Sequence, residues 1–142
     1  MKQTYLVGMG SNIDPEHHLS SAAMAIRKLF PDACFSTVFR SPAVGMGKAE
    51  DFLNACCRLH STKPAEALEA WLKQVEDEHE RDRSHGSWKP RTLDLDLLMA
   101  GEDVLDDELF RYAHAYVPAK ELVHLPEVEL DTSLLQATSL QL

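Results

Sequence analysis

Cysteines and long apolar runs are scarce in this sequence. Its 142 residues include three cysteines, Cys34, Cys56 and Cys57, and none belongs to a C-x-x-C pair, so we expect neither a disulfide framework nor a zinc site. No segment approaches the roughly 20 apolar residues of a membrane-spanning helix. The run Tyr5-Leu6-Val7 is too short for the apolar part of a signal peptide. These absences favour a cytoplasmic protein that does not bind a membrane.

Basic residues are also in deficit. Lys and Arg number 14 against 23 Asp and Glu, which gives a formal net charge of −9. Such an acidic chain is poorly suited to the phosphate backbone of a nucleic acid or to an anionic membrane surface. We therefore expect partners that are small molecules.

Common nucleotide-binding and hydrolase motifs are missing. Segment 8–13, Gly-Met-Gly-Ser-Asn-Ile, has Ile where a dinucleotide fingerprint needs its third glycine. Gly47-Lys48 is followed by Ala49, where a P-loop has Ser or Thr. Neither H-E-x-x-H nor G-x-S-x-G occurs. Any nucleotide would therefore be bound by other means.

The length and the order of periodic segments predict a single domain over 1–142. Hydrophobic residues make up 44% and charged residues 26%, as in globular proteins. The expected elements are strands over 4–9, 34–39, 52–59 and 92–99, a helix over 15–30, and a helix that opens at 62–64. This β-α-β-β-α-β order predicts an α+β ferredoxin-like sandwich, an antiparallel sheet with both helices on one face. In the acidic extension 101–142 we expect an extra strand or hairpin near 103–110 and a short helix near 118–123.

The segment Thr92-Leu93-Asp94-Leu95-Asp96-Leu97-Leu98 alternates apolar and acidic residues. On a strand, the leucines would face the core, while Asp94 and Asp96 would share the opposite face about 6.6–7 Å apart. Two carboxylates at this separation suit Mg²⁺ or Mn²⁺, which relieves their repulsion. The alternative is an ordinary exposed strand face with solvated aspartates.

A basic segment precedes this pair. Segment 81–91 holds four basic residues, one acidic residue and one tryptophan: Arg81, Arg83, Lys89, Arg91, Asp82 and Trp88. Guanidinium groups next to a carboxylate pair suit a metal-bound polyphosphate. The alternative is a solvated basic loop that forms salt bridges with the acidic C-terminal third, with Trp88 either stacking on a ring or filling the core.

The run from Trp88 to Leu98, Trp-Lys-Pro-Arg-Thr-Leu-Asp-Leu-Asp-Leu-Leu, resembles the signature of the 6-hydroxymethyl-7,8-dihydropterin pyrophosphokinase family. The resemblance extends to Gly10-Ser11-Asn12, to Arg40-Ser41-Pro42 and to Phe52-Leu53-Asn54-Ala55. It implies a ferredoxin-like fold and the transfer of pyrophosphate from ATP to the hydroxymethyl group of the dihydropterin, with release of AMP.

The resemblance also implies roles for individual residues. Asp94 and Asp96 match the aspartates that hold two Mg²⁺ ions against the phosphates of ATP, and Arg81 and Arg91 match arginines that engage those phosphates. Six further positions match residues that bind ATP or line the ATP or pterin site: Glu76, Arg83, Trp88, Leu97, His114 and Lys120. Those that match the pterin pocket are Ser41, Pro42, Val44, Phe52, Asn54 and Leu122.

The departures from the family pattern lie in the C-terminal third. The family usually has Pro where this chain has Ala113, Arg where it has Lys120, and an aromatic residue where it has Leu122. That aromatic residue normally covers the pterin opposite Phe52. Two alternatives therefore stay open: an Mg²⁺–ATP-dependent transferase with another acceptor, and a ferredoxin-like ligand-binding module without catalysis. A monomer is favoured.

Overall fold

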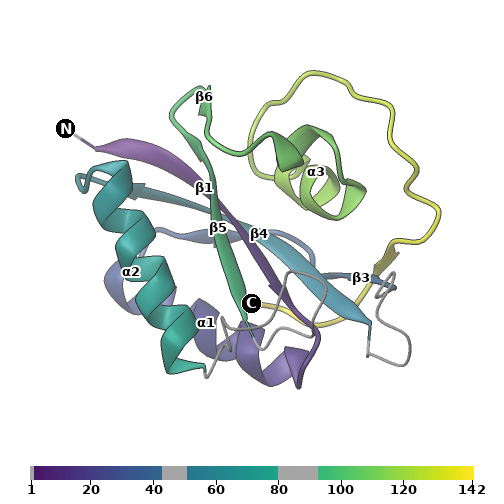
Figure 1. Cartoon of the computed structure of the whole chain (residues 1–142), viewed down its shortest axis with the longest axis horizontal. Coiled ribbons are helices and arrows are strands. Elements are labelled where there is room, and N and C mark those ends of the chain that lie inside the picture. The colour runs from purple at the N-terminus through teal and green to yellow at the C-terminus, as the bar shows by residue number, and fades with distance from the viewer. Residues whose placement is uncertain (1, 43–50, 80–92) are drawn as a thin grey trace.

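The computed structural model describes residues 2–42, 51–79 and 93–142 (Figure 1). Its elements follow the predicted order. They are β1 (Gln3–Ser11), α1 (Pro15–Leu29), β2 (Cys34–Phe35), β3 (Phe39–Ser41), β4 (Phe52–Ser61), α2 (Ala65–Glu78), β5 (Asp94–Ala100), β6 (Asp103–Val104), a 3-10 helix η1 (Asp107–Phe110), α3 (Ala113–Lys120) and β7 (Gln136–Ala137).

The strands form one antiparallel sheet in the order β6-β5-β1-β4-β3-β7, with β2 also paired to β4. The central strand β1 runs between β4 and β5. Its Gly10 is opposite Asn54 on β4 and Asp94 on β5, and its Gly8 is opposite Cys56 and Asp96. Because directly opposite residues point to the same side of a sheet, these side chains share one face.

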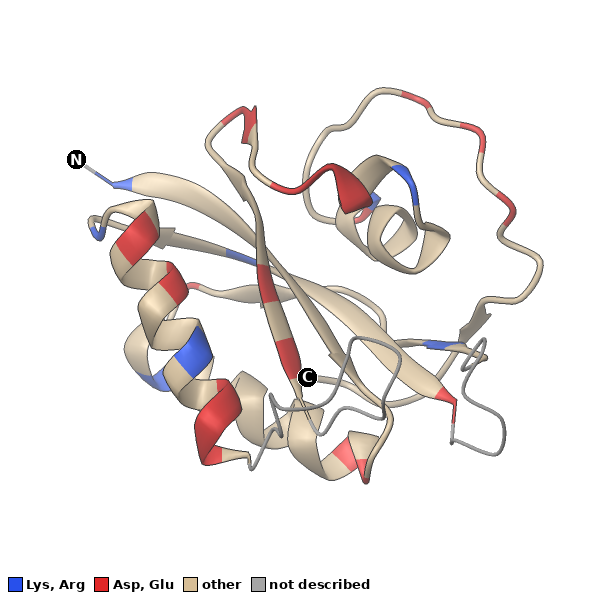
Figure 2. Ribbon diagram, in the orientation of Figure 1, with Lys and Arg blue, Asp and Glu red and all other residues tan. Residues whose placement is uncertain are grey.

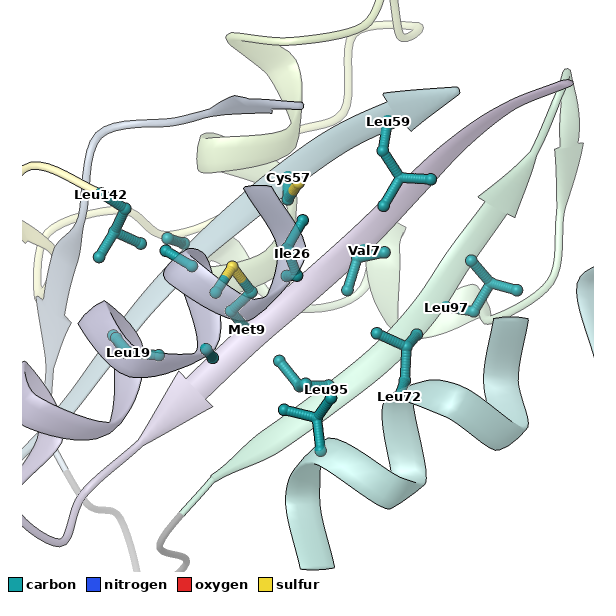
Figure 3. Packing of buried hydrophobic residues seen from close by; sticks show 14 of the residues in the cluster. Val7, Met9, Leu19, Ile26, Cys57, Leu59, Leu72, Leu95, Leu97 and Leu142 are labelled. Atoms are coloured by element: carbon teal, nitrogen blue, oxygen red, sulfur yellow. The ribbon is translucent and has the colours of Figure 1, made fainter. Parts of the chain in front are cut away.

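The first face of the sheet packs on α1 and α2 (Figure 3). The apolar residues of β5 at alternate positions, Leu95 and Leu97, lie in this core with Leu72 of α2. The leucine face of the segment 92–98 is therefore the core face, as the alternation predicts.

The second face is covered at one end by the C-terminal third. Leu6, Cys56, Leu98 and Met99 pack there against a group from η1, α3 and the segment after it: Leu109, Tyr116, Ala119 and Leu125. A register shift between Leu6 and Val7 turns both Leu98 and Met99 toward this face. The ferredoxin-like fold is confirmed, and the short helix expected in the C-terminal extension lies on the second face of the sheet.

Two expectations about element boundaries are corrected. The single strand over 34–39 is split, because Ser36 Oγ accepts a hydrogen bond from Cys56 N at 2.8 Å and Thr37 N donates to Glu121 Oε1 at 2.8 Å. Between Phe35 and Phe39 there is one residue more than between their partners on β4. The short helix starts at Ala113 rather than near 118, so Pro118 lies inside it.

The C-terminal segment returns to the sheet. β7 pairs with β3, Thr138 N donates to Val38 O at 2.9 Å, and Leu142 is buried in the first core. Cys56 and Cys57 point to opposite faces of the sheet, and burial raises the pKa of both thiols. Among the helices of the described residues, none is long and apolar enough to cross a membrane.

Candidate active site

Asp94 and Asp96 occupy the beginning of β5, on the second face of the sheet. Both side chains are half-buried, whereas Leu98, two residues further along the same face, is fully covered by the C-terminal third. Figure 2 shows the acidic positions of β5 as two red segments, near the start of the strand and next to β1. The sheet thus presents two neighbouring carboxylates just beyond the edge of the second core.

Two glycines of β1 stand beside this pair in the sheet. Gly10 lies opposite Asp94 and Gly8 opposite Asp96. A Cβ atom on Gly10 would come within 3.1 Å of Asn54 Oδ1, and one on Gly8 within 3.1 Å of Leu98 Cδ1. These two glycines form a strip of β1 next to the carboxylates, and the absence of their side chains lets Leu98 lie over Gly8 and the Asn54 amide over Gly10.

Asn54 borders the strip on the other side. It is buried, and its Nδ2 donates to Ser41 Oγ of β3 at 2.9 Å. The half-buried Phe52 is paired with Ser41, and the exposed Pro42 follows directly after β3. The structure therefore gathers four of the residues assigned to the pterin pocket at the end of β3 and the beginning of β4.

Electrostatics makes the aspartate pair a fitting site for a cation. The pKa of Asp96 is raised to about 8, first by burial, then by the charge of Asp94 and a hydrogen bond with it, and then by the charges of Glu76 and Glu108. Bound Mg²⁺ would replace the proton that Asp96 retains, and oxygen donors are the ligands it prefers.

The donor set also indicates what completes the coordination. Among the described residues, no group of three or more His, Cys, Asp or Glu side chains is arranged to hold a metal. Mg²⁺ is commonly held by one or two carboxylates together with substrate phosphates and water. The Asp94–Asp96 pair therefore fits a cation that arrives with a polyphosphate rather than a cation held by the protein alone.

Two groups from the C-terminal third stand near the pair. The charge of Glu108, in η1, acts on Asp96, and that of Asp94 acts on His114, in α3. The pKa of His114 is lowered, because burial outweighs the opposing effect of the negative charge of Asp94. His114 also stacks on Tyr112, with ring centroids 5.3 Å apart. Glu108 was not predicted, because no sequence pattern shows that η1 folds back beside β5.

Two predicted residues lie beneath the sheet surface. The side chain of Leu97 belongs to the first core, on the face opposite Asp94 and Asp96. Glu76 is also buried, and its Oε2 accepts a hydrogen bond from Leu95 N at 2.6 Å. It thus contacts the strand that carries the aspartates.

Lys120 and Leu122 lie at the far end of α3. Lys120 Nζ forms an ion pair with Glu127 at 2.7 Å on the surface. Leu122 packs at the border of the second core, and its carbonyl accepts a bond from Arg58 Nη1 at 2.7 Å. The remaining predicted residues, Val44, Arg81, Arg83, Trp88 and Arg91, lie outside the described residues.

A cavity of about 490 Å³ is present elsewhere on the second face. It lies at the other end of β1, where Thr4 and Leu6 line it together with Met99 and Phe110. Its lining includes none of the predicted site residues, so it is separate from the candidate active site.

Comparison with known proteins agrees with this geometry. A family model described as 7,8-dihydro-6-hydroxymethylpterin-pyrophosphokinase matches residues 6–132. A Pseudomonas aeruginosa protein named 2-amino-4-hydroxy-6-hydroxymethyldihydropteridine pyrophosphokinase is 32% identical over 139 residues, which cover 94% of this chain and 84% of that protein. A protein of the same name from Campylobacter jejuni is 33% identical over 130 residues, covering 88% and 81%.

A third relative of that name, from Haemophilus influenzae, is 28% identical over 139 residues, which cover 96% of this chain and 86% of the relative. The match thus runs through both the aspartate pair of β5 and the strands around Asn54. The chain belongs to the 7,8-dihydro-6-hydroxymethylpterin-pyrophosphokinase family.

Proposed function

We propose that this protein transfers the pyrophosphoryl group of ATP to the hydroxymethyl group of 6-hydroxymethyl-7,8-dihydropterin and releases AMP. The observation that carries the proposal is the half-buried Asp94–Asp96 pair, separated from Asn54 by the glycine strip of β1, in a chain of this family. One side of the strip suits a metal-bound polyphosphate, and the other suits a flat ring with a polar edge.

The reaction needs no nucleophile from the protein. The hydroxyl oxygen of the pterin forms the new bond to the β-phosphorus, the bond from that phosphorus to the α-phosphate oxygen breaks, and the hydroxyl proton is lost. The residues contribute by orienting the two substrates and by placing charge near the phosphates. Two Mg²⁺ ions held by Asp94 and Asp96 would neutralise the phosphate charge in this site.

On the acceptor side, the Asn54 amide would form hydrogen bonds with the polar edge of the pterin. Phe52 would stack on the ring face, since an aromatic pair contributes roughly 0.5–1.5 kcal/mol beyond its buried area. Ser41 and Pro42, followed by Val44, would border the same pocket, with Leu122 on the opposite side.

On the donor side, we assign the phosphates of ATP to the arginines of the basic segment. Arg81 and Arg91 would bind the phosphates bidentately, and Arg83, Trp88 and His114 would complete the nucleotide site. The backbone of Leu97 and the ammonium group of Lys120 are further candidates on this side.

The test is AMP production by the purified protein from ATP and Mg²⁺, with and without the dihydropterin. AMP that appears only with the pterin supports the proposal. AMP formation with another hydroxyl compound, but not with the pterin, would show that the protein is a transferase with a different acceptor. ATP binding without any AMP would identify a binding module. Because every proposed contact comes from one chain, we expect the protein to be a monomer, which light scattering can measure. We also expect it to act in the cytoplasm, where ATP is abundant.

A further inference from the structure

One charged residue of α2 is buried in the apolar interior. Glu76 is 2% exposed and belongs with Leu68, Leu72 and Val75 to the buried side of the helix. It follows Leu72 by four residues, so it continues the apolar stripe rather than the polar side. Burying a carboxylate costs several kcal/mol unless specific partners compensate, and a leucine at this position would pack without that cost.

The carboxylate holds the outer edge of β5. Glu76 Oε2 accepts the hydrogen bond from Leu95 N at 2.6 Å. In an antiparallel sheet, successive residues direct their backbone groups to opposite edges. Asp94 and Asp96 therefore bond to β1, whereas the N–H of Leu95 points away from it. In the described part of the chain, β6 pairs with β5 only at Met99 and Ala100, so at Leu95 a side chain takes the place of a neighbouring strand.

We infer that Glu76 is a positioning residue that fixes the spacing and direction of the two aspartates. Leu95 stands between Asp94 and Asp96, so a shift of its backbone moves both carboxylates at once. Mg²⁺ requires near-ideal octahedral geometry at about 2.0–2.1 Å, so small displacements weaken its binding. This inference rests on the proposed metal site, which it deepens.

The test compares two substitutions of Glu76 with the same substitutions at Glu69, which is exposed on α2. Glu76→Leu keeps the size but removes the acceptor, and Glu76→Gln keeps a carbonyl acceptor without the charge. Amide hydrogen exchange at Leu95 reports the hydrogen bond from Leu95 N to the side chain of residue 76. Mn²⁺ titration in the presence of α,β-methylene-ATP, which cannot transfer pyrophosphate, reports the aspartate pair by electron paramagnetic resonance.

We expect Glu76→Leu to speed exchange at Leu95 and to weaken Mn²⁺ binding by about 10–100-fold, as losses of outer-shell partners typically do. Glu76→Gln should restore most of the protection and lose less than about threefold in Mn²⁺ affinity, because the acceptor remains. Both Glu69 variants should match the wild-type protein.

Normal Mn²⁺ affinity in a folded Glu76→Leu variant with fast exchange at Leu95 would overturn the inference. If Glu76→Leu does not fold, Glu76→Gln decides alone: a tenfold or greater loss of Mn²⁺ affinity would show that charge, not strand positioning, matters. A wild-type protein that binds no Mn²⁺ together with α,β-methylene-ATP overturns the metal assignment and the inference together. A wild-type protein that binds Mn²⁺ but makes no AMP contradicts the proposed function alone.

Discussion

Gly10 and Asn54 face each other across β1 and β4, and the space that a Cβ of Gly10 would occupy lies 3.1 Å from Asn54 Oδ1. The amide of Asn54 cannot simply turn away, because its Nδ2 is bonded to Ser41 Oγ at 2.9 Å. The missing side chain of one residue therefore determines where the polar end of the other lies. The strand conformation at residue 10 could accommodate any amino acid, so the close contact with Asn54 is the reason that a glycine is needed there.

Gly10→Ala should raise the KM for the dihydropterin by roughly tenfold, because the added methyl displaces an amide that a hydrogen bond holds, at a cost of about 1.4 kcal/mol. Gly8→Ala is the matched control. Its added methyl would meet the end of the Leu98 side chain rather than Asn54, so the KM for the dihydropterin should stay close to the wild-type value. Steady-state kinetics with varied pterin at saturating ATP measure both. Equal KM values for Gly10→Ala and the wild-type protein would contradict the placement of Asn54 in the pocket.

Asp94→Ala and Asp96→Ala should each lower turnover by at least about a thousandfold, equivalent to roughly 4 kcal/mol of lost transition-state stabilisation. Both carboxylates are half-buried at the end of the second core, so the variants should remain folded. AMP formation and circular dichroism measure the two effects. Loss of several kcal/mol of folding stability would show that the pair is structural instead.

Without Mg²⁺, the titration of Asp96 should lower the stability of the protein as the pH rises from about 4 to 8. The pKa of Asp96 is about 8 in the folded chain and 3.8 in its ordinary environment, so the folded state retains a proton that the unfolded state has released. Stability therefore falls between these two pKa values and levels off above about 8, where both states have released the proton. Asp96→Asn should flatten this fall, and Mg²⁺ should stabilise the wild-type protein more at pH 8.5 than at pH 6.5. Melting temperatures in EDTA and in Mg²⁺ provide the check.

Leu122→Phe should tighten pterin binding by up to about tenfold, since an aromatic ring would add a second stacking face worth roughly 0.5–1.5 kcal/mol. Leu122 is half-buried at the border of the second core. Direct titration with the pterin measures the effect. Unchanged or weaker binding would show that Leu122 does not border the pocket.

Leu142→Ala should lower the free energy of unfolding by about 2–3 kcal/mol, the lower part of the range for buried leucines. Leu142 is 7% exposed and packs in the first core, whereas Leu134, the control for the same substitution, is 62% exposed. Urea unfolding of both variants gives the comparison. Similar stability losses at the two positions would contradict the docking of the C-terminal segment.

Short-range patterns predicted most of the fold because they depend on backbone geometry alone. Alternation along 92–98 separated Leu95 and Leu97 from the two aspartates, and the spacing of Leu68, Leu72 and Val75 located the buried side of α2. The same spacing includes Glu76. Its position four residues after Leu72 places Glu76 on the buried side of the helix, although a carboxylate is seldom found there.

Long-range partners explain what the sequence did not predict. The expected strand 34–39 is divided because Thr37 bonds to Glu121 and Val38 bonds to Thr138, residues far away in the chain. The proximity of Glu108 to Asp96 depends in the same way on how the segment after β5 folds back. Such contacts arise from tertiary packing, which local propensity does not encode.

The bond between Val38 and Thr138 joins residues 100 positions apart. During synthesis at about 5–20 residues per second, the ribosome needs roughly 5–20 seconds to make the intervening chain. Throughout that interval the outer edge of β3 has no neighbour in the nascent chain, and an open strand edge is a template for pairing with other polypeptides. Conditions that slow translation after residue 41 should therefore increase aggregation of this protein, and the pairing of Gln136–Ala137 with β3 ends the exposure.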